Sequence, residues 1–153
     1  MLTRVSLVAR RKPPVLAARE VRALVRETLR ESGRAGAPPV TVVFSNDEEI
    51  RGLNRVYRGK DKPTDVLSFS AGESFPPGEE TLGDIIISID TAAGQARKRR
   101  WSVEKEVRVL LIHGVLHLLG YDHETDDGEM IALERVVRRK LLSTKDDRRN
   151  RRL

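Results

Sequence analysis

The sequence predicts a single α+β domain in which a mixed sheet of about four strands packs against helices. Three observations support this fold class. Short β-branched segments alternate with longer segments whose apolar residues recur at helical spacing. The length of 153 residues is that of one ordinary domain. No repeat or break in composition divides the chain, so we expect one domain over residues 1–142 and a charged, disordered tail over 143–153.

The first part of the chain predicts a strand, a helix and a second strand. Apolar and polar residues alternate over residues 2–9, which is typical of a strand. Apolar residues at helical spacing predict a helix over 16–31. After a turn at 33–39, the β-branched and aromatic residues 40–44 predict the second strand.

The middle of the chain predicts a helix, a strand and a loop. Ser45 or Asn46 can cap a helix that runs to about Tyr57, because the acidic residues in its first turn match the positive end of the helix dipole. Residues 65–69 predict a short strand. Two prolines and two glycines predict a loop over 71–80.

The last part of the chain predicts one strand and three helices. Residues 82–88 are mostly apolar, which is typical of a central strand. Asp90 and Ser102 are the expected caps of the first two helices. The first of these ends in a basic run, and the second stops at Gly120. The third, over 129–142, is amphipathic.

Composition limits the chemistry that the chain can carry. It has no cysteine, so a metal could be held only by histidine, carboxylate or backbone oxygen. The formal net charge of +6 favours polyanionic partners, although mixed charges on solvated helix faces give the same balance. Arg4 interrupts the apolar N-terminal stretch, and the longest apolar run, at 109–112, is too short to span a bilayer. We therefore expect a soluble, cytoplasmic protein with no membrane partner.

The three histidines of the chain lie in one stretch, HGVLHLLGYDH. His113 and His117 are four residues apart on a predicted helix, so their rings leave the same face one turn apart. Gly120 can adopt a positive φ at the helix end and turn the chain, which would bring His123 back over that face. Three imidazoles with one open position describe a catalytic zinc site, because structural sites normally use four protein ligands. We therefore expect a zincin-like site for one Zn²⁺ per chain, although other divalent metals suit the same ligands.

The residue after the first histidine argues against a peptidase. The spacing of the histidines and the glycine matches the metzincin peptidases, in which a glutamate follows the first histidine and serves as general base. Gly114 occupies that position here. Without the carboxylate, the usual route for activating water against a peptide bond is missing. Peptidase activity is therefore not expected.

A second polar segment precedes the strand predicted at 65–69. Residues 54–69 read NRVYRGKDKPTDVLSF, in which charged side chains cluster before an apolar strand. Such a run is commonly a loop with solvated charges. The alternative is a loop that contacts phosphate beside the metal, for which a guanidinium is suited because it is always charged and binds phosphate through two N–H groups.

The chain resembles the YbeY family of bacterial endoribonucleases over about residues 40–140. The resemblance rests on the two segments above and on GDIIIS at 83–88, in the order and separation that the family shows. It implies zinc ligands at His113, His117 and His123, and a functionally important arginine at Arg58. It also implies metal-dependent cleavage of single-stranded RNA, maturation of the 16S ribosomal RNA 3′ end, ribosome quality control, and the small ribosomal subunit as partner.

Several residue roles remain open from the sequence. We expect the catalytic role of Arg58 to be the neutralisation of charge that builds on phosphate in the transition state. The general base is not identified, and the candidates by proximity to the motifs are Asp65, Asp84, Asp122 and Glu124. Asp122 could instead orient a ligand histidine.

Candidate RNA-binding residues are Lys60 and the basic run Arg97, Lys98, Arg99 and Arg100. The run is followed by Trp101, so charge and base stacking could act together. Cations at a helix C-terminus are also favourable without any ligand. Two other functions compete with an endoribonuclease: a different zinc hydrolase, and a non-catalytic RNA-binding factor of ribosome assembly whose metal is structural.

Overall fold

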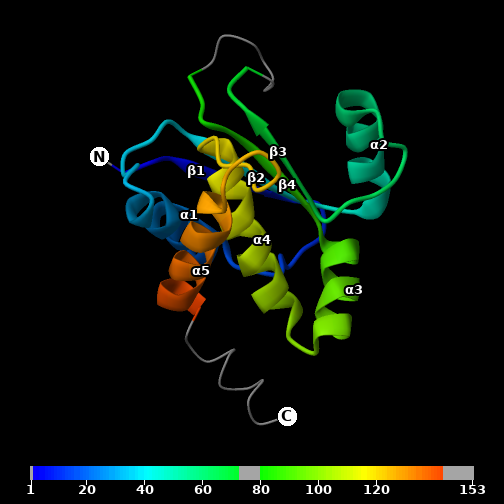
Figure 1. Cartoon of the computed structure of the whole chain (residues 1–153). Coiled ribbons are helices and arrows are strands. Elements are labelled where there is room, and N and C mark those ends of the chain that lie inside the picture. Colours follow the sequence, from blue (N-terminus) through cyan, green and yellow to red (C-terminus); the bar gives the residue numbers. More distant parts are fainter. Residues whose placement is uncertain (1, 73–79, 143–153) are drawn as a thin grey trace.

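The computed structural model describes residues 2–72 and 80–142, which form one mixed sheet with helices on both faces (Figure 1). The strands are β1 (Val5–Ala9), β2 (Val40–Ser45), β3 (Val66–Ser70) and β4 (Gly83–Ser88). The helices are α1 (Ala18–Glu31), α2 (Asp47–Arg58), α3 (Ile89–Arg99), α4 (Val103–Leu118) and α5 (Glu129–Leu142). The sheet order is β1-β2-β4-β3, with β3 antiparallel to β4 and the other pairs parallel. The predicted α+β fold with a mixed four-stranded sheet is confirmed.

Different helices cover the two faces of the sheet. On one face α1 and α4 bury the larger core, in which Ile85 and Ile87 of the central strand β4 are fully buried. α5 packs on α4 through a second apolar cluster. On the opposite face Ile50 of α2 packs with Phe69 and Ile86. Because β4 is buried on both faces, its sequence is a nearly continuous apolar run, as predicted for a central strand.

The helix caps agree with the sequence at two of three predicted positions. The side chains of Asn46 and Ser102 each accept a hydrogen bond from the backbone N–H three residues on. The prediction for α3 was wrong, because Ser88 is the cap and its hydroxyl accepts from the backbone N–H of Thr91. Asp90 lies in the first turn, and its carboxylate accepts from the backbone N–H of Asp47.

Some element boundaries shift by one to three residues from those predicted. β1 begins at Val5, α1 begins at Ala18, and β3 starts after Asp65, whose carboxylate accepts from the backbone N–H of Val66. The last helix spans 129–142 as expected. Most of the predicted loop at 71–80 and the predicted tail at 143–153 lie outside the described residues. None of the helices among the described residues is long and apolar enough to cross a membrane.

Candidate metal centre

The C-terminal half of α4 presents two histidines to one point. His113 and His117 are one turn apart and both half-buried. Their Nε2 atoms lie 2.9 Å from each other, and their ring centroids are 4.5 Å apart. The predicted placement of both rings on one helix face is therefore confirmed.

A tight turn after α4 returns the chain over these rings. Gly120 adopts a φ of 96°, and its backbone N–H bonds to the carbonyl of His117. The N–H of Tyr121 bonds to the carbonyl of Leu116, so the two bonds together form a Schellman motif that ends the helix. The His123 ring centroid then lies 5.9 Å from that of His113 and 6.1 Å from that of His117.

The three imidazoles fit one metal ion. Their candidate ligand nitrogens all lie within 4.8 Å of one another. Tetrahedral zinc holds nitrogen ligands at about 2.1 Å, and therefore about 3.4 Å from each other. The observed spacing, 2.9 Å for the His113–His117 pair and no more than 4.8 Å for the set, is of the same size. Three neutral nitrogen donors leave a fourth coordination position for water or substrate, as in catalytic sites.

The surroundings of His117 favour its neutral form. Burial lowers the pKa of this imidazole below its ordinary value, and the neighbouring charges of His113 and His123 act in the same direction. Asp122 and a backbone hydrogen bond with Tyr121 oppose this shift without reversing it. A metal ligand must be deprotonated, so a lowered pKa makes His117 available to a metal at neutral pH.

A carboxylate on α5 contacts the ring of His113, and sequence reasoning missed it. Nδ1 of His113 lies 3.4 and 3.5 Å from the two carboxylate oxygens of Glu134. Burial by itself would raise the pKa of Glu134, but the hydrogen bond and charge of His113, with the charge of Arg138, hold it below its ordinary value. Glu134 was hidden because its contact depends on how α5 packs against α4, which no local motif reports.

A cavity of about 430 Å³ lies beside the histidines. Its lining residues come from α4, the turn after it, strand β3 and the end of α2. They are Arg58, Asp65, Val66, Leu67, Ser68, Ser70, His113, His117, Gly120, Tyr121 and Asp122. Of the four candidate bases, Asp65 and Asp122 thus line the cavity, whereas Asp84 and Glu124 do not.

Arg58 reaches the cavity from the last position of α2. Gly59 ends the helix with a φ of 70°. The Arg58 guanidinium donates to the carbonyl of Ser68 over 3.0 Å and lies 4.9 Å from the centre of the Phe69 ring. These contacts with β3 keep the exposed guanidinium of Arg58 at the cavity wall, which His113 and His117 also line. The structure therefore brings Arg58 together with the histidines.

Gly114 faces the sheet. A Cβ atom there would lie 2.8 Å from Cγ2 of Ile85 and 3.3 Å from Oγ of Ser68. The Ser68 hydroxyl donates to the Gly114 carbonyl over 3.1 Å. In metzincins this position carries the general base. Here α4 packs so closely on the sheet at Gly114 that a glutamate side chain has no room.

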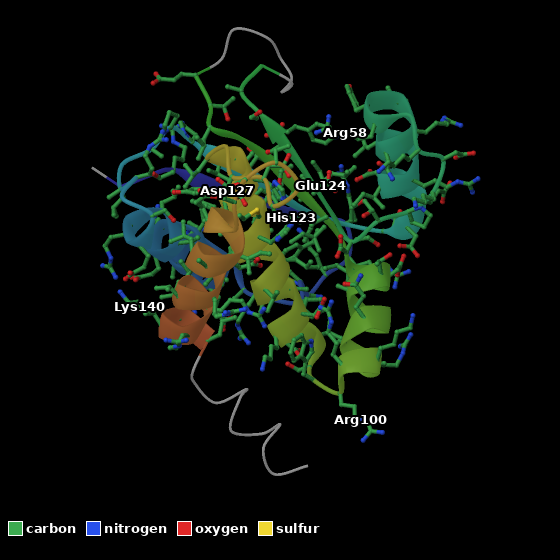
Figure 2. All side chains as sticks on the ribbon, in the orientation of Figure 1. Arg58, Arg100, His123, Glu124, Asp127 and Lys140 are labelled. Atoms are coloured by element: carbon green, nitrogen blue, oxygen red, sulfur yellow. The ribbon has the colours of Figure 1, made fainter. Side chains whose placement is uncertain are left out.

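The candidate RNA-binding residues fall into two groups. Lys60 is exposed and lies two residues beyond Arg58. The run 97–100 lies at the other end of α4, and Figure 2 shows Arg100 far from His123. Within that run, Arg99 pairs with the buried Glu106. The structure does not bring the run together with the metal centre.

Comparisons with known proteins agree with the motifs. Residues 10–142 match the family model described as Endoribonuclease YbeY. An Endoribonuclease YbeY of Solibacter usitatus is 42% identical over 136 residues, which cover 89% of this chain and 87% of the relative. One of Aquifex aeolicus is 58% identical over 85 residues, which cover 56% of each chain. The solution structure of a Thermotoga maritima protein has a TM-score of 0.58 at 27% identity, and covers 94% of this chain and 95% of that one. The family predicted from the sequence is confirmed.

Proposed function

We propose that this chain, which belongs to the YbeY family, is a metal-dependent endoribonuclease that cleaves single-stranded RNA. We assign zinc as its metal and His113, His117 and His123 as the ligands. We also propose that it matures the 3′ end of 16S ribosomal RNA on the small ribosomal subunit and takes part in ribosome quality control in the cytoplasm.

One observation carries the proposal. A cluster of three imidazoles, whose ligand nitrogens lie within 4.8 Å of one another, borders the cavity that Arg58 also lines. Cleavage of a phosphodiester needs stabilisation of negative charge on the phosphoryl oxygens, which a metal held by the histidines would supply together with the guanidinium of Arg58. Arg58 lines this cavity and is itself exposed, which suits a polymeric substrate.

The residues of the chain divide the chemistry between them. A divalent metal bound at the histidines supplies Lewis acidity to a phosphoryl oxygen, or lowers the pKa of a water molecule toward neutrality. Arg58 binds the phosphate and neutralises the charge that develops on it. Its hydrogen bond to the Ser68 carbonyl orients the guanidinium before RNA arrives.

The proton acceptor comes from the cavity wall. Asp65 and Asp122 are the candidate bases that line it. One oxygen of Asp65 already accepts from the backbone N–H of Val66, and one oxygen of Asp122 accepts from that of Glu124. The second oxygen of either carboxylate can accept the proton of a water molecule or of the ribose 2′-OH, which is the nucleophile that RNA carries itself.

RNA contacts are proposed in two places. Lys60, which is exposed and two residues beyond Arg58, would add a second positive charge for the phosphates. Arg97, Lys98 and Arg100 are exposed at the α3–α4 corner and would bind phosphates of the same strand at a distance from the cleavage position. Arg99 takes part mainly through its contact with Trp101, whose ring centre lies 5.5 Å from the guanidinium carbon.

The competing functions make different predictions for the histidines. A peptidase is disfavoured because Gly114 provides no carboxylate and no room for one. For a non-catalytic assembly factor with a structural metal, substitution of a ligand would unfold the domain. For an enzyme, the apolar cores that hold α4 keep the domain folded without the metal.

Metal content and RNA cleavage measured on the same purified samples test the proposal. Wild type is expected to hold about one zinc per chain and to cut single-stranded RNA. His117→Ala is expected to remain folded by circular dichroism and to lose both properties. Glu104→Gln, an exposed glutamate in the first turn of the same helix, is the matched control and keeps both.

Three outcomes would contradict the proposal. Cleavage that persists unchanged in folded, metal-free His117→Ala would place the nuclease activity elsewhere. Unfolding of His117→Ala would indicate a structural metal and would favour the non-catalytic assembly factor over the enzyme. Casein hydrolysis that a chelator abolishes would indicate a peptidase.

A further inference from the structure

The interface between α4 and α5 contains one polar pair in an otherwise apolar stripe. On α4, Val109, Ile112 and Leu116 belong to the apolar cluster that α5 closes. On α5, Met130 and Val137 are fully buried in the same cluster. Glu134 lies between them, four residues after Met130 and three before Val137, so all three side chains share one face of the helix.

The position of Glu134 is unusual for a carboxylate. Its side chain is only 17% exposed, and that of His113 is 26% exposed. A partly buried carboxylate loses hydration and needs a hydrogen-bond donor in return. Nδ1 of His113, 3.4 Å away, is the nitrogen placed to be that donor.

The two nitrogens of His113 therefore have different partners. Nδ1 faces the carboxylate of Glu134, and Nε2 faces Nε2 of His117. A proton held on Nδ1 by the carboxylate leaves the lone pair of Nε2 directed at the other imidazoles. A carboxylate behind a ligand histidine fixes its tautomer and ring orientation and increases its basicity.

We propose that Glu134 is a positioning residue of the metal centre, which keeps the proton of His113 on Nδ1 so that Nε2 is free to bind the metal. This inference rests on the metal centre proposed above and extends it to α5. Helix α5 then contributes to metal affinity through one hydrogen bond, in addition to covering α4 with apolar side chains.

Zinc affinity of the metal-free protein, measured by competition with a chromogenic chelator, tests the role. Glu134→Ala is expected to weaken zinc binding by about 10- to 100-fold. Glu134→Gln keeps an acceptor without the charge, so its loss is expected to be smaller. Glu31→Gln is the matched control, because Glu31 also binds α5, through Lys140 at 2.8 Å, and does not take part in the histidine cluster.

The tautomer of His113 gives a second readout that a merely structural role would not move. Nitrogen NMR of the metal-free protein near pH 8 is expected to show His113 protonated on Nδ1 in wild type and in Glu31→Gln. Glu134→Ala is expected to show a mixture of tautomers.

The two readouts separate the possible failures. Wild-type zinc affinity in folded Glu134→Ala overturns the inference. If that variant does not fold, the wild-type spectrum decides, because a proton found on Nε2 of His113 also overturns it. If wild type binds no zinc, the proposed metal function fails, whereas a proton on Nδ1 of wild-type His113 that is lost in Glu134→Ala would still support the contact.

Discussion

At the N-terminal end of α4, Glu106 is fully buried and accepts hydrogen bonds from Arg99 over 2.6 Å and from the Trp101 indole over 2.7 Å. The Lys105 ammonium lies 4.5 Å from the centre of the Trp101 ring. At the C-terminal end of the same helix, His113 and His117 remain half-buried, and their Nε2 atoms face each other. At the N-terminal end a carboxylate pairs with a cation, whereas at the C-terminal end imidazole rings of the same kind face one another.

This difference separates a polar cluster whose groups satisfy one another from one that could hold a metal ion. Both carboxylate oxygens of Glu106 have donors within the protein, so the cluster fixes the α3–α4 corner and leaves little for a ligand to satisfy. The histidines present three nitrogens to one point next to a cavity, and that arrangement is stabilised most by a cation. Glu106 lies seven residues before His113 and eleven before His117, which is about 10 and about 16 Å along the helix axis, so substitutions can address the two clusters separately.

The largest effect is expected at the histidine end, from the loss of Arg58. Arg58→Ala is expected to lower RNA cleavage by about 10²- to 10³-fold, because charge on the phosphate is no longer neutralised in the transition state. Zinc content and unfolding are expected to stay at wild-type values, since Arg58 is exposed. Single-turnover cleavage rates measure the effect, with Arg55→Ala on the same helix as control. A rate for Arg58→Ala equal to that of the control would remove Arg58 from the mechanism.

At the other end of α4 the effect is expected on stability. Glu106→Gln removes a buried charge and leaves an amide between two donors, and we expect it to lower the free energy of unfolding by about 1–3 kcal/mol. The cost stays below that of breaking a fully buried ion pair, because the Arg99 side chain is 49% exposed. Urea denaturation compares this variant with Glu104→Gln, an exposed glutamate of the same turn. Equal midpoints for the two variants would mean that the cluster does not stabilise the corner.

A smaller loss of stability is expected from Gly114→Ala. The added methyl group would lie 2.8 Å from Cγ2 of Ile85, a branched atom close to the backbone, so either α4 or β4 has to shift. Overpacking of this kind costs about 1–3 kcal/mol, and the better helix propensity of alanine offsets about 1 kcal/mol of it. Gly94→Ala on α3 is the control, because a Cβ there meets nothing within 4 Å. If Gly114→Ala and Gly94→Ala stabilise the protein equally, a methyl group at position 114 does not overpack the contact between α4 and β4.

The sequence predicted the features of the metal centre that depend on local geometry. His113 and His117 follow from helical spacing, and the return of His123 follows from the glycine that turns the chain. The placement of Arg58 at the same cavity came from the resemblance, because it depends on the packing of α2 and β3, which lie on other parts of the chain. Glu134 was missed for the same reason, since the spacing of 21 residues from His113 carries no periodic signal.

The errors in the fold also lie where tertiary contacts decide between local alternatives. Ser88 and Asp90 can each cap a helix. Ser88 became the cap, and the Asp90 carboxylate instead accepts from the backbone N–H of Asp47 at the start of α2. Likewise, the basic run looks uniform in sequence and all four of its residues are exposed, yet Arg99 contacts a buried glutamate.

The smallest effect is expected where the corner would bind RNA. Double substitution of Arg97 and Lys98 by glutamate is expected to raise KM for a long single-stranded RNA several-fold and to reduce the salt dependence of binding, because two phosphate contacts are lost. The rate at saturating RNA and the zinc content stay unchanged, since the corner is remote from the histidines. A short oligonucleotide that occupies only the cavity is the internal control and is cleaved at the wild-type KM. Equal KM increases for short and long RNA would mean that the substitutions act through the general field of the protein and that the corner makes no contact of its own.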